Sequence, residues 1–198
     1  MRKDLTQQRR EEIIDAARKC FMSRGFHATG MTDIAREFGM STGHIYNYFP
    51  SKLAIIEEVI SRGMQEFYKS SCAIQSNLDS YEQTLKHVRN ILLPLMKKER
   101  VSLSLEMLIE ATHDPSLAKI LQQADEKARA HLRSLRKFPP EDPKDLAELE
   151  VMMGTFEGVG IRILRNPNAD KNLICEVVAD RLFARHEALK AKASRVYR

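Results

Sequence analysis

The sequence predicts an all-α protein, and three observations lead to that prediction. The 198 residues include only eight glycines and seven prolines, about 8% of the chain against a usual ~12%, so helix-breaking residues are scarce. Apolar residues recur at three- and four-residue spacing along most of the chain, as they do on one face of a helix. Residues 101–107 alternate like a strand, but no second candidate strand could pair with them, so we expect a helix there as well.

The first predicted helix has Thr6 as its N-cap and ends near Arg24. Gly25 follows it as a glycine able to take positive φ and stop the helix. The apolar residues of this segment share one face and are expected to enter a core: Ile13, Ile14, Ala17, Cys20 and Phe21.

Two short helices follow. Thr32 is predicted to cap the second helix, which ends at Gly39. Ser41 is predicted to cap the third, which carries Ile45, Tyr48 and Phe49 and is closed by Pro50. Because only three residues join these two helices, they are expected to cross steeply, as in a helix-turn-helix.

The remaining chain also has the pattern of helices. Ser51 opens a fourth helix, and Pro94 is expected to kink a helix over 81–98. Asp114 is predicted to cap a helix that runs to about Lys137, before a loop at 138–143. A final pair is expected over 144–165 and 171–193. We therefore predict two domains, a head at 1–52 and a larger helical body at 53–198.

The third helix has the residue types of a DNA-reading surface. Beside its inward apolar residues it presents Ser41, Thr42, Gly43, His44, Tyr46 and Asn47, which are small or able to form hydrogen bonds. Lys52 and Tyr46 could hold phosphates. The net charge of +5, with +3 in residues 1–52, permits a polyanionic partner. The alternative is that this is an ordinary solvated helix with packing tyrosines.

The head resembles the N-terminal signature of TetR-family transcriptional regulators. The similarity is dense from Thr32 to Lys52 and includes the run Ile45-Tyr46-x-Tyr48-Phe49-x-Ser51-Lys52. It also covers two earlier segments, Ile13-Ile14-Asp15-Ala16-Ala17 and Arg24-Gly25-Phe26. The rest of the chain carries no such signature.

The resemblance implies a homodimer with a three-helix DNA-binding head on a ligand-binding and dimerising body. It implies a repressor that a small-molecule effector releases from a palindromic operator. The family's DNA contacts correspond to Thr32, Ser41, Thr42, Gly43, Tyr46, Tyr48 and Lys52, to which the polar face adds His44 and Asn47. Thr42 stands where many members have lysine, and His44 where threonine is common, so operator preference is open. The fourth helix is expected to carry the effector's signal; effector-binding residues are not assigned.

The last two helices are the candidates for a dimer interface. Gly154 and Gly158 lie on one helical face, where small residues permit close approach. An apolar stripe follows the last helix through Leu173, Val177, Val178, Leu182 and Phe183. A stripe of this kind needs a partner helix, which could belong to a second copy or to the same chain.

Other classes of function find little support. His186-Glu187-Ala188-Leu189-Lys190 begins like a zincin motif but has lysine in place of the second histidine, so we expect no metal site, no cofactor and no enzyme. Three widely spaced cysteines predict no disulfide, and no apolar run predicts a membrane span or a secretory signal, so we expect a cytoplasmic protein. Two alternatives remain: an effector-independent DNA-binding protein of this fold, and a helical protein-interaction adaptor.

Overall fold

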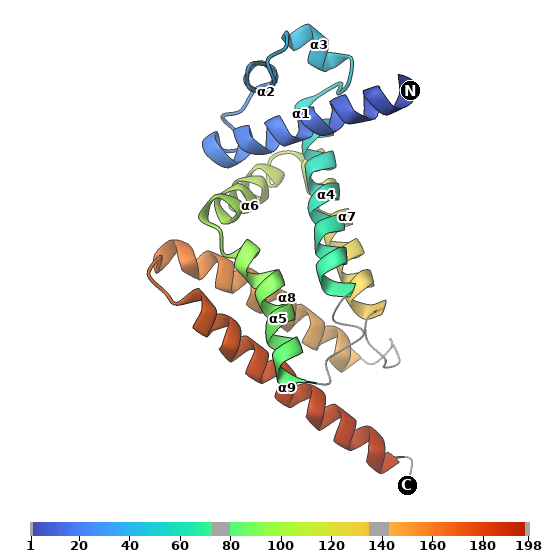
Figure 1. Ribbon diagram of the computed structural model, residues 1–198, viewed down its shortest axis with the longest axis vertical. Coiled ribbons are helices and arrows are strands. Elements are labelled where there is room, and N and C mark those ends of the chain that lie inside the picture. Colours follow the sequence, from blue (N-terminus) through green and yellow to red (C-terminus); the bar gives the residue numbers. More distant parts are fainter. Residues whose placement is uncertain (1, 73–79, 135–142, 197–198) are drawn as a thin grey trace. The chain divides into compact units, whose positions relative to one another are not determined.

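The computed structural model describes residues 2–72, 80–134 and 143–196, and within these ranges the chain forms α-helices and no strand (Figure 1). The prediction of an all-α fold is confirmed. The nine helices described are α1 Arg2–Arg24, α2 Met31–Phe38, α3 Thr42–Tyr46, α4 Lys52–Cys72, α5 Tyr81–Leu95, α6 Lys98–Ala111, α7 Pro115–Ser134, α8 Pro143–Arg165 and α9 Lys171–Val196.

Most predicted helix ends are confirmed, and local chemistry explains them. Gly25 and Gly39 have φ of +86° and +78°, the left-handed conformation that glycine adopts most easily. Three side chains cap as expected. The Oγ of Ser41 accepts the His44 N–H at 3.3 Å, that of Ser51 accepts the Ala54 N–H at 3.1 Å, and Oδ1 of Asp114 accepts the Ser116 N–H at 2.8 Å.

Two predicted N-caps are wrong. Thr6 lies inside α1, which already begins at Arg2. Thr32 lies inside α2, whose N-cap is Gly30. The carboxylate of Asp33 accepts the Gly30 N–H at 3.0 Å and so satisfies the backbone just before the helix.

Two helix ends also differ from the prediction. The third helix ends at Tyr46, so Tyr48 and Phe49 lie in the turn beyond it. Pro94 does not kink a helix through 98; α5 ends at Leu95 and α6 begins at Lys98. Proline lacks the N–H that the Asn90 carbonyl would accept, so the helix stops one residue later. Residues 135–142, which hold most of the predicted loop, lie outside the described residues.

The chain divides into two compact units. Unit 1 comprises residues 1–65 and 99–128, and unit 2 comprises 66–98 and 129–198. Unit 1 therefore includes part of the predicted body, because Leu103 of α6 and Leu117 of α7 pack into the core built by α1–α4. The functional division at 52/53 stays a prediction.

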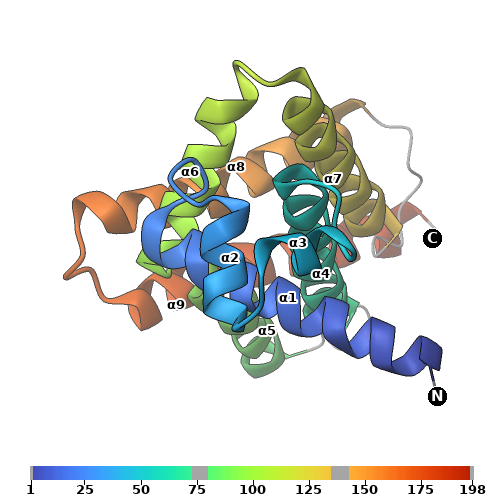
Figure 2. The same cartoon turned by 90° about the horizontal axis from the view of Figure 1, so that it is seen from above.

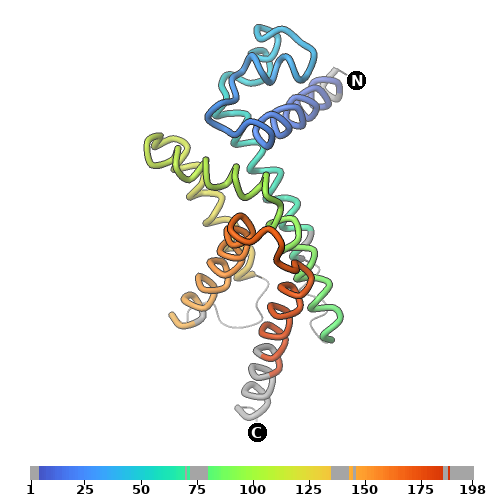
Figure 3. The backbone as a smooth tube through the Cα atoms, turned by 90° about the vertical axis from the view of Figure 1, so that its left-hand side faces the viewer, coloured from blue at the N-terminus to red at the C-terminus, as the bar shows by residue number. Residues whose placement is uncertain are grey.

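The core of unit 2 lies between α5, α8 and α9. Val88 and Leu92 of α5 pack with Ile163 of α8 and with Cys175 and Ala179 of α9. Figure 3 shows α5 and α9 side by side in the tube trace, in agreement with their packing. The apolar faces of α5, α8 and α9 thus meet in one shared core, whereas Leu103 of α6 and Leu117 of α7 belong to the core of unit 1.

Candidate nucleic-acid interface

Two buried residues fix the orientation of α3. Ile45 is fully buried and Phe49, just after the helix, is 1% exposed, and both belong to the core of unit 1. The left-handed Gly39 ends α2, and Ser41 caps α3 two residues later. Because these contacts hold the apolar side of α3, its other side faces solvent. Figure 1 and, from above, Figure 2 show α2 and α3 on the same side of α1.

The sequence-predicted site residues come together on this surface of the head. Six are exposed: Thr32, Ser41, Gly43, His44, Tyr46 and Asn47. Tyr46 leaves 51% of its surface in solvent, which is unusual for a large aromatic residue without a partner. A Cβ on Gly43 would meet no atom within 4 Å, so the backbone at that point is open to approach. Their individual roles in binding DNA stay predictions.

The other three predicted residues are half-buried: Thr42, Tyr48 and Lys52. The Nζ of Lys52 donates to the Phe26 carbonyl at 3.0 Å and lies 4.3 Å from the centre of the Phe26 ring. Burial lowers the pKa of Lys52, and the charge of Glu110 opposes that shift. The predicted phosphate contact of Lys52 would therefore have to share or replace an internal hydrogen bond.

Arg10 of α1 is a residue that sequence reasoning missed. Its Nη1 donates to the Tyr48 carbonyl at 2.6 Å, and its guanidinium lies 4.2 Å from the centre of the Phe49 ring. It therefore holds the chain where α3 ends and so helps to position the polar face. The hydrogen bond joins residues 38 positions apart, and no local spacing signals such a partner.

The turn after α1 is held by a second set of unpredicted contacts. The Phe26 N–H donates to Oε2 of Glu106 in α6 at 2.7 Å, and the Thr29 hydroxyl donates to the Gly25 carbonyl at 2.7 Å. Nδ1 of His27 lies 3.1 Å from Oε2 of Glu110, also in α6. With the Lys52 bond, both backbone polar groups of the buried Phe26 are satisfied.

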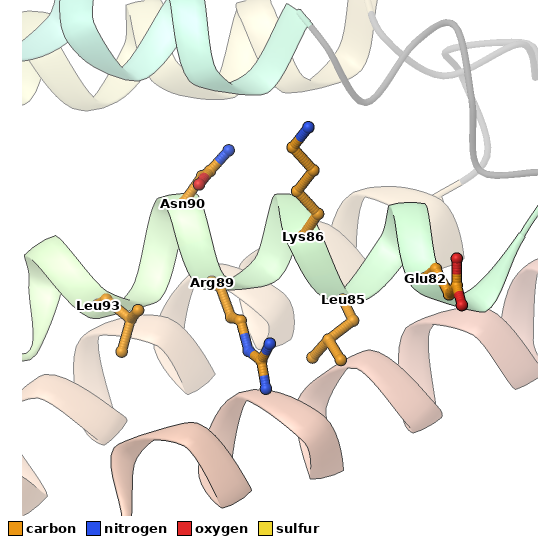
Figure 4. Close-up of a pocket in the computed structure, with 6 residues that line it drawn as sticks. All are labelled: Glu82, Leu85, Lys86, Arg89, Asn90 and Leu93. Carbon is orange, nitrogen blue, oxygen red and sulfur yellow. The ribbon is translucent and has the colours of Figure 1, made fainter.

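An open cavity of about 450 Å³ lies along α5 in unit 2 (Figure 4). It has a mixed lining: Leu85 and Leu93 are apolar, Lys86, Arg89 and Asn90 carry donors, and Glu82 is acidic. Arg89 also forms an ion pair with Glu176 of α9 at 2.9 Å. The volume falls within the ~300–1,000 Å³ of small-molecule sites.

Part of the surface of α8 and α9 is apolar. Val151, Gly154, Gly158 and Ile161 recur at helical spacing along α8, with Val151 70% and Ile161 37% exposed. A Cβ on either of these glycines would meet no atom within 4 Å, so neither makes a close contact within its own chain. The apolar stripe predicted for α9 is partly buried and partly exposed. Val178 packs inward, whereas Leu173 and Val177 are 56% and 45% exposed.

Other candidate chemistry finds no support in the described part of the chain. No group of three or more metal-binding side chains occurs there, and none of its helices is long and apolar enough to cross a bilayer. Cys20 and Cys175 are buried, and burial raises the pKa of both thiols, which disfavours the reactive thiolate. The side chain of His186 lies outside the described residues.

Comparisons with known proteins point to one family. Residues 13–59 match the model described as "Bacterial regulatory proteins, tetR family". The HTH-type transcriptional regulator YfiR of Bacillus subtilis, described as uncharacterized, is 33% identical over 103 residues, or 47% of this chain and 50% of that protein. The HTH-type transcriptional repressor KstR2 of Rhodococcus jostii is 34% identical over 73 residues, or 36% of each protein.

Solved structures show that the likeness in fold extends further. A putative TetR-family transcriptional regulator from Mesorhizobium loti has a TM-score of 0.73 at 19% identity, covering 93% of this chain and 97% of that one. The fatty acid degradation regulator FadR from Bacillus halodurans has a TM-score of 0.69 at 19% identity, covering 88% and 94%. At this identity the likeness concerns the fold alone.

The match to the family model lies near the N-terminus, over residues 13–59. The aligned regions span half the length of the Bacillus subtilis relative and about a third of the Rhodococcus one. The resemblance noted from the residues is confirmed over residues 13–59, and the aligned relatives are named as transcriptional regulators.

Proposed function

We propose that the chain is a regulator of the TetR family, whose model matches residues 13–59, and that two copies of it bind a palindromic operator through the polar face of α3. One observation carries the proposal. Ile45 and Phe49 are buried to 1% exposure or less, while Ser41, His44 and Asn47 beside them are exposed. A short helix anchored on one side, with small and hydrogen-bonding side chains on the other, fits a major groove.

We assign base contacts to the side chains near the exposed end of α3, and phosphate contacts to those around it. Thr42, His44 and Asn47 are short enough to read base edges, and Gly43 permits close approach. Thr32, Ser41, Tyr46 and Tyr48 carry hydroxyls suited to phosphate oxygens. Lys52 is the least available of the predicted contacts, since its ammonium already bonds Phe26.

The apolar surface of α8 and α9 supports the proposed homodimer. Four apolar side chains are exposed on these two consecutive helices, Val151, Ile161, Leu173 and Val177, and a Cβ on Gly154 or Gly158 of α8 would meet no described atom of another segment within 4 Å. A second copy would cover this surface and give the two recognition helices the two-fold relation that a palindrome requires. Recognition helices about 34–36 Å apart, or a multiple of that, would fit successive major grooves.

We propose further that the protein is a repressor released by a small molecule, acting in the cytoplasm. The cavity along α5 supports a ligand of modest size with both apolar and polar groups. Two proteins of similar fold were solved with ligands, a regulator from Saccharomonospora viridis with choline and FadR from Bacillus subtilis with stearoyl-CoA. KstR2 is named as a repressor. An effector-independent DNA-binding protein of the same fold is the second candidate.

The decisive experiment is selection of bound duplexes from a random pool with the wild-type chain. We expect an enriched palindrome, with affinity that falls steeply as salt increases. Asn47→Ala should weaken binding about 5- to 150-fold, the range for losing one good base contact, whereas the exposed Gln123→Ala in α7 should leave it unchanged. Failure to enrich any palindrome would count against the proposal and in favour of an adaptor.

A screen for release then tests the effector. We expect one class of compound to lower the affinity for the selected operator, and Leu85→Arg, which fills the cavity along α5, to abolish that effect without changing operator binding. If binding to the palindrome never changes with any compound, the protein is the constitutive DNA-binding protein instead.

A further inference from the structure

The basic side chains of the head are engaged within the protein. Among the side chains described between residues 5 and 65, six basic ones form ion pairs: Arg9 with Glu12 at 2.8 Å, Arg10 with Glu58 at 3.9 Å, Lys19 with Glu37 at 3.9 Å, Arg24 and Arg36 with Asp33 at 2.7 and 3.3 Å, and Arg62 with Asp15 at 2.9 Å. Arg10 and Lys52 also donate to backbone carbonyls, and Arg18 has a partner as well. These cations would have to share or exchange an internal contact in order to bind a phosphate.

His44 is different. Its side chain is exposed on the polar face of α3, and its one recorded neighbour is the Tyr48 ring, 5.6 Å away between centroids. His27, by contrast, lies 3.1 Å from the Glu110 carboxylate. Among the described residues, no carboxylate lies within 4 Å of the His44 imidazole, so a proton on it would add a full unit of charge to this face.

The charged groups on the neighbouring elements do not offset that charge. Several of those on α1, α2 and α4 are already paired among themselves: Arg10 with Glu58, Lys19 with Glu37, Arg24 and Arg36 with Asp33.

We propose that His44 binds DNA as an imidazolium against the phosphate backbone, so that each protomer takes up a proton when it binds its operator. The inference rests on the proposed function, because it concerns the chemistry of the same DNA-binding surface. It adds one titratable charge to the fixed charges of the lysine and arginines around that surface.

His44 can meet a phosphate without giving up an ion pair. Exposed ion pairs are weak, so Arg36 can exchange Asp33 for a phosphate while Arg24 keeps that carboxylate at 2.7 Å, but Arg36 then loses its own 3.3 Å contact. A protonated His44 loses no such contact. Histidine is the side chain whose charge ordinarily changes between about pH 5 and 8. Phosphates favour its charged form, so binding is tightest at low pH and weakens as pH rises and the proton is lost.

The test measures the dissociation constant against pH and salt. The probes are the selected palindrome and, for the sequence-independent part of binding, a mixed-sequence duplex of about 30 base pairs. If phosphates favour the imidazolium by about tenfold, the wild-type dissociation constant should rise about sixfold per protomer from about pH 6 to about pH 8. The slope of log affinity against log salt should also be steeper at low pH, by about 0.9 per protomer.

Three variants make the result specific. His44→Asn keeps a hydrogen-bonding side chain without a titratable charge, so its pH profile should be flat and its salt slope independent of pH. His44→Lys should bind tightly with little pH dependence. His113→Gln, at an exposed histidine just after α6, should behave as wild type. Circular dichroism melts should show all three folded, because both histidines are exposed.

Two outcomes overturn the inference while leaving the proposed function intact. A wild-type dissociation constant equal at both pH values would mean that His44 contacts DNA as a neutral imidazole. If the dissociation constant of His44→Asn still depends on pH, a group other than His44 takes up the proton. Absence of salt-dependent binding to either duplex at any pH would instead refute the proposed function itself.

Discussion

Gly25→Ala tests how the turn after α1 is held. Gly25 has φ +86°, and a Cβ built on it would lie 2.6 Å from Cδ of Glu106, with the carboxylate oxygens closer still. The same carboxylate accepts the Phe26 N–H at 2.7 Å. Alanine would therefore adopt a disfavoured backbone conformation and also displace the group that satisfies a buried amide.

The two costs can be estimated separately. A left-handed conformation costs a non-glycine residue about 1–2 kcal/mol. Loss of a hydrogen bond to a charged group costs about 1.5–3 kcal/mol. Gly25→Ala should therefore destabilise unit 1 by about 2.5–5 kcal/mol. Gly39→Ala is the matched control, because Gly39 has φ +78° and no atom within 4 Å of its Cβ position, so it should show the conformational cost alone.

The assay is thermal or urea unfolding at one fixed protein concentration, since any dimerisation links stability to concentration. For a chain of this length, about 1 kcal/mol corresponds to a 2–4 °C shift in Tm. In a Glu106→Ala background the displaced bond is already absent, so Gly25→Ala should cost no more than Gly39→Ala does in the wild type. If Gly25→Ala costs as little as Gly39→Ala in the wild type, or costs the same in both backgrounds, the role given to Glu106 is wrong.

Three further predictions concern the core, the stability of the protein at acidic pH, and the dimer. Ile45→Ala removes a fully buried side chain beneath α3 and should cost about 2–5 kcal/mol in urea unfolding; less than about 1 kcal/mol would mean that α3 is not anchored there. The N–H of Gly30 first, and the nearby arginines after it, hold the pKa of Asp33 below its ordinary value. The stabilisation is therefore present above the unfolded pKa of about 3.9 and lost as pH falls through the folded value. Between about pH 2 and 5, the free energy of unfolding of wild type should increase with pH relative to that of Asp33→Asn. Curves of unfolding free energy against pH that stay parallel for the two proteins would contradict this. Val151→Glu puts a charge on the apolar surface of α8 and should weaken dimerisation at least about tenfold in sedimentation without unfolding the monomer; an equally tight dimer would place the interface elsewhere.

Local signals served well where a single residue decides a helix end. Gly39 and Ser41 lie two residues apart, and each acts on backbone groups within its own turn, so their roles could be predicted without knowing the fold. The same reasoning failed at Thr32, because a glycine with an acidic residue three positions later competed successfully for the N-cap. Threonine is a good N-cap, but local chemistry allowed either Thr32 or Gly30 to take that position.

Contacts between distant segments were outside the reach of such signals. Arg10 and Tyr48 are 38 positions apart, and Phe26 and Glu106 are 80 apart. Neither pair follows a helical or strand spacing. The hydrogen bond from Lys52 to the Phe26 carbonyl was also not predicted, because the sequence pattern of a lysine next to a DNA-binding helix is equally consistent with a phosphate contact.

By itself, the sequence determined that the chain is helical and where its third short helix turns a polar face outward, since both depend on spacing and caps within a few residues. Only the tertiary structure decided that α6 and α7 complete the core beneath the head, and that nearly every cation of the head is already held by a carboxylate or carbonyl. Pairing of that kind depends on which surfaces meet, and long-range packing sets this rather than local propensity.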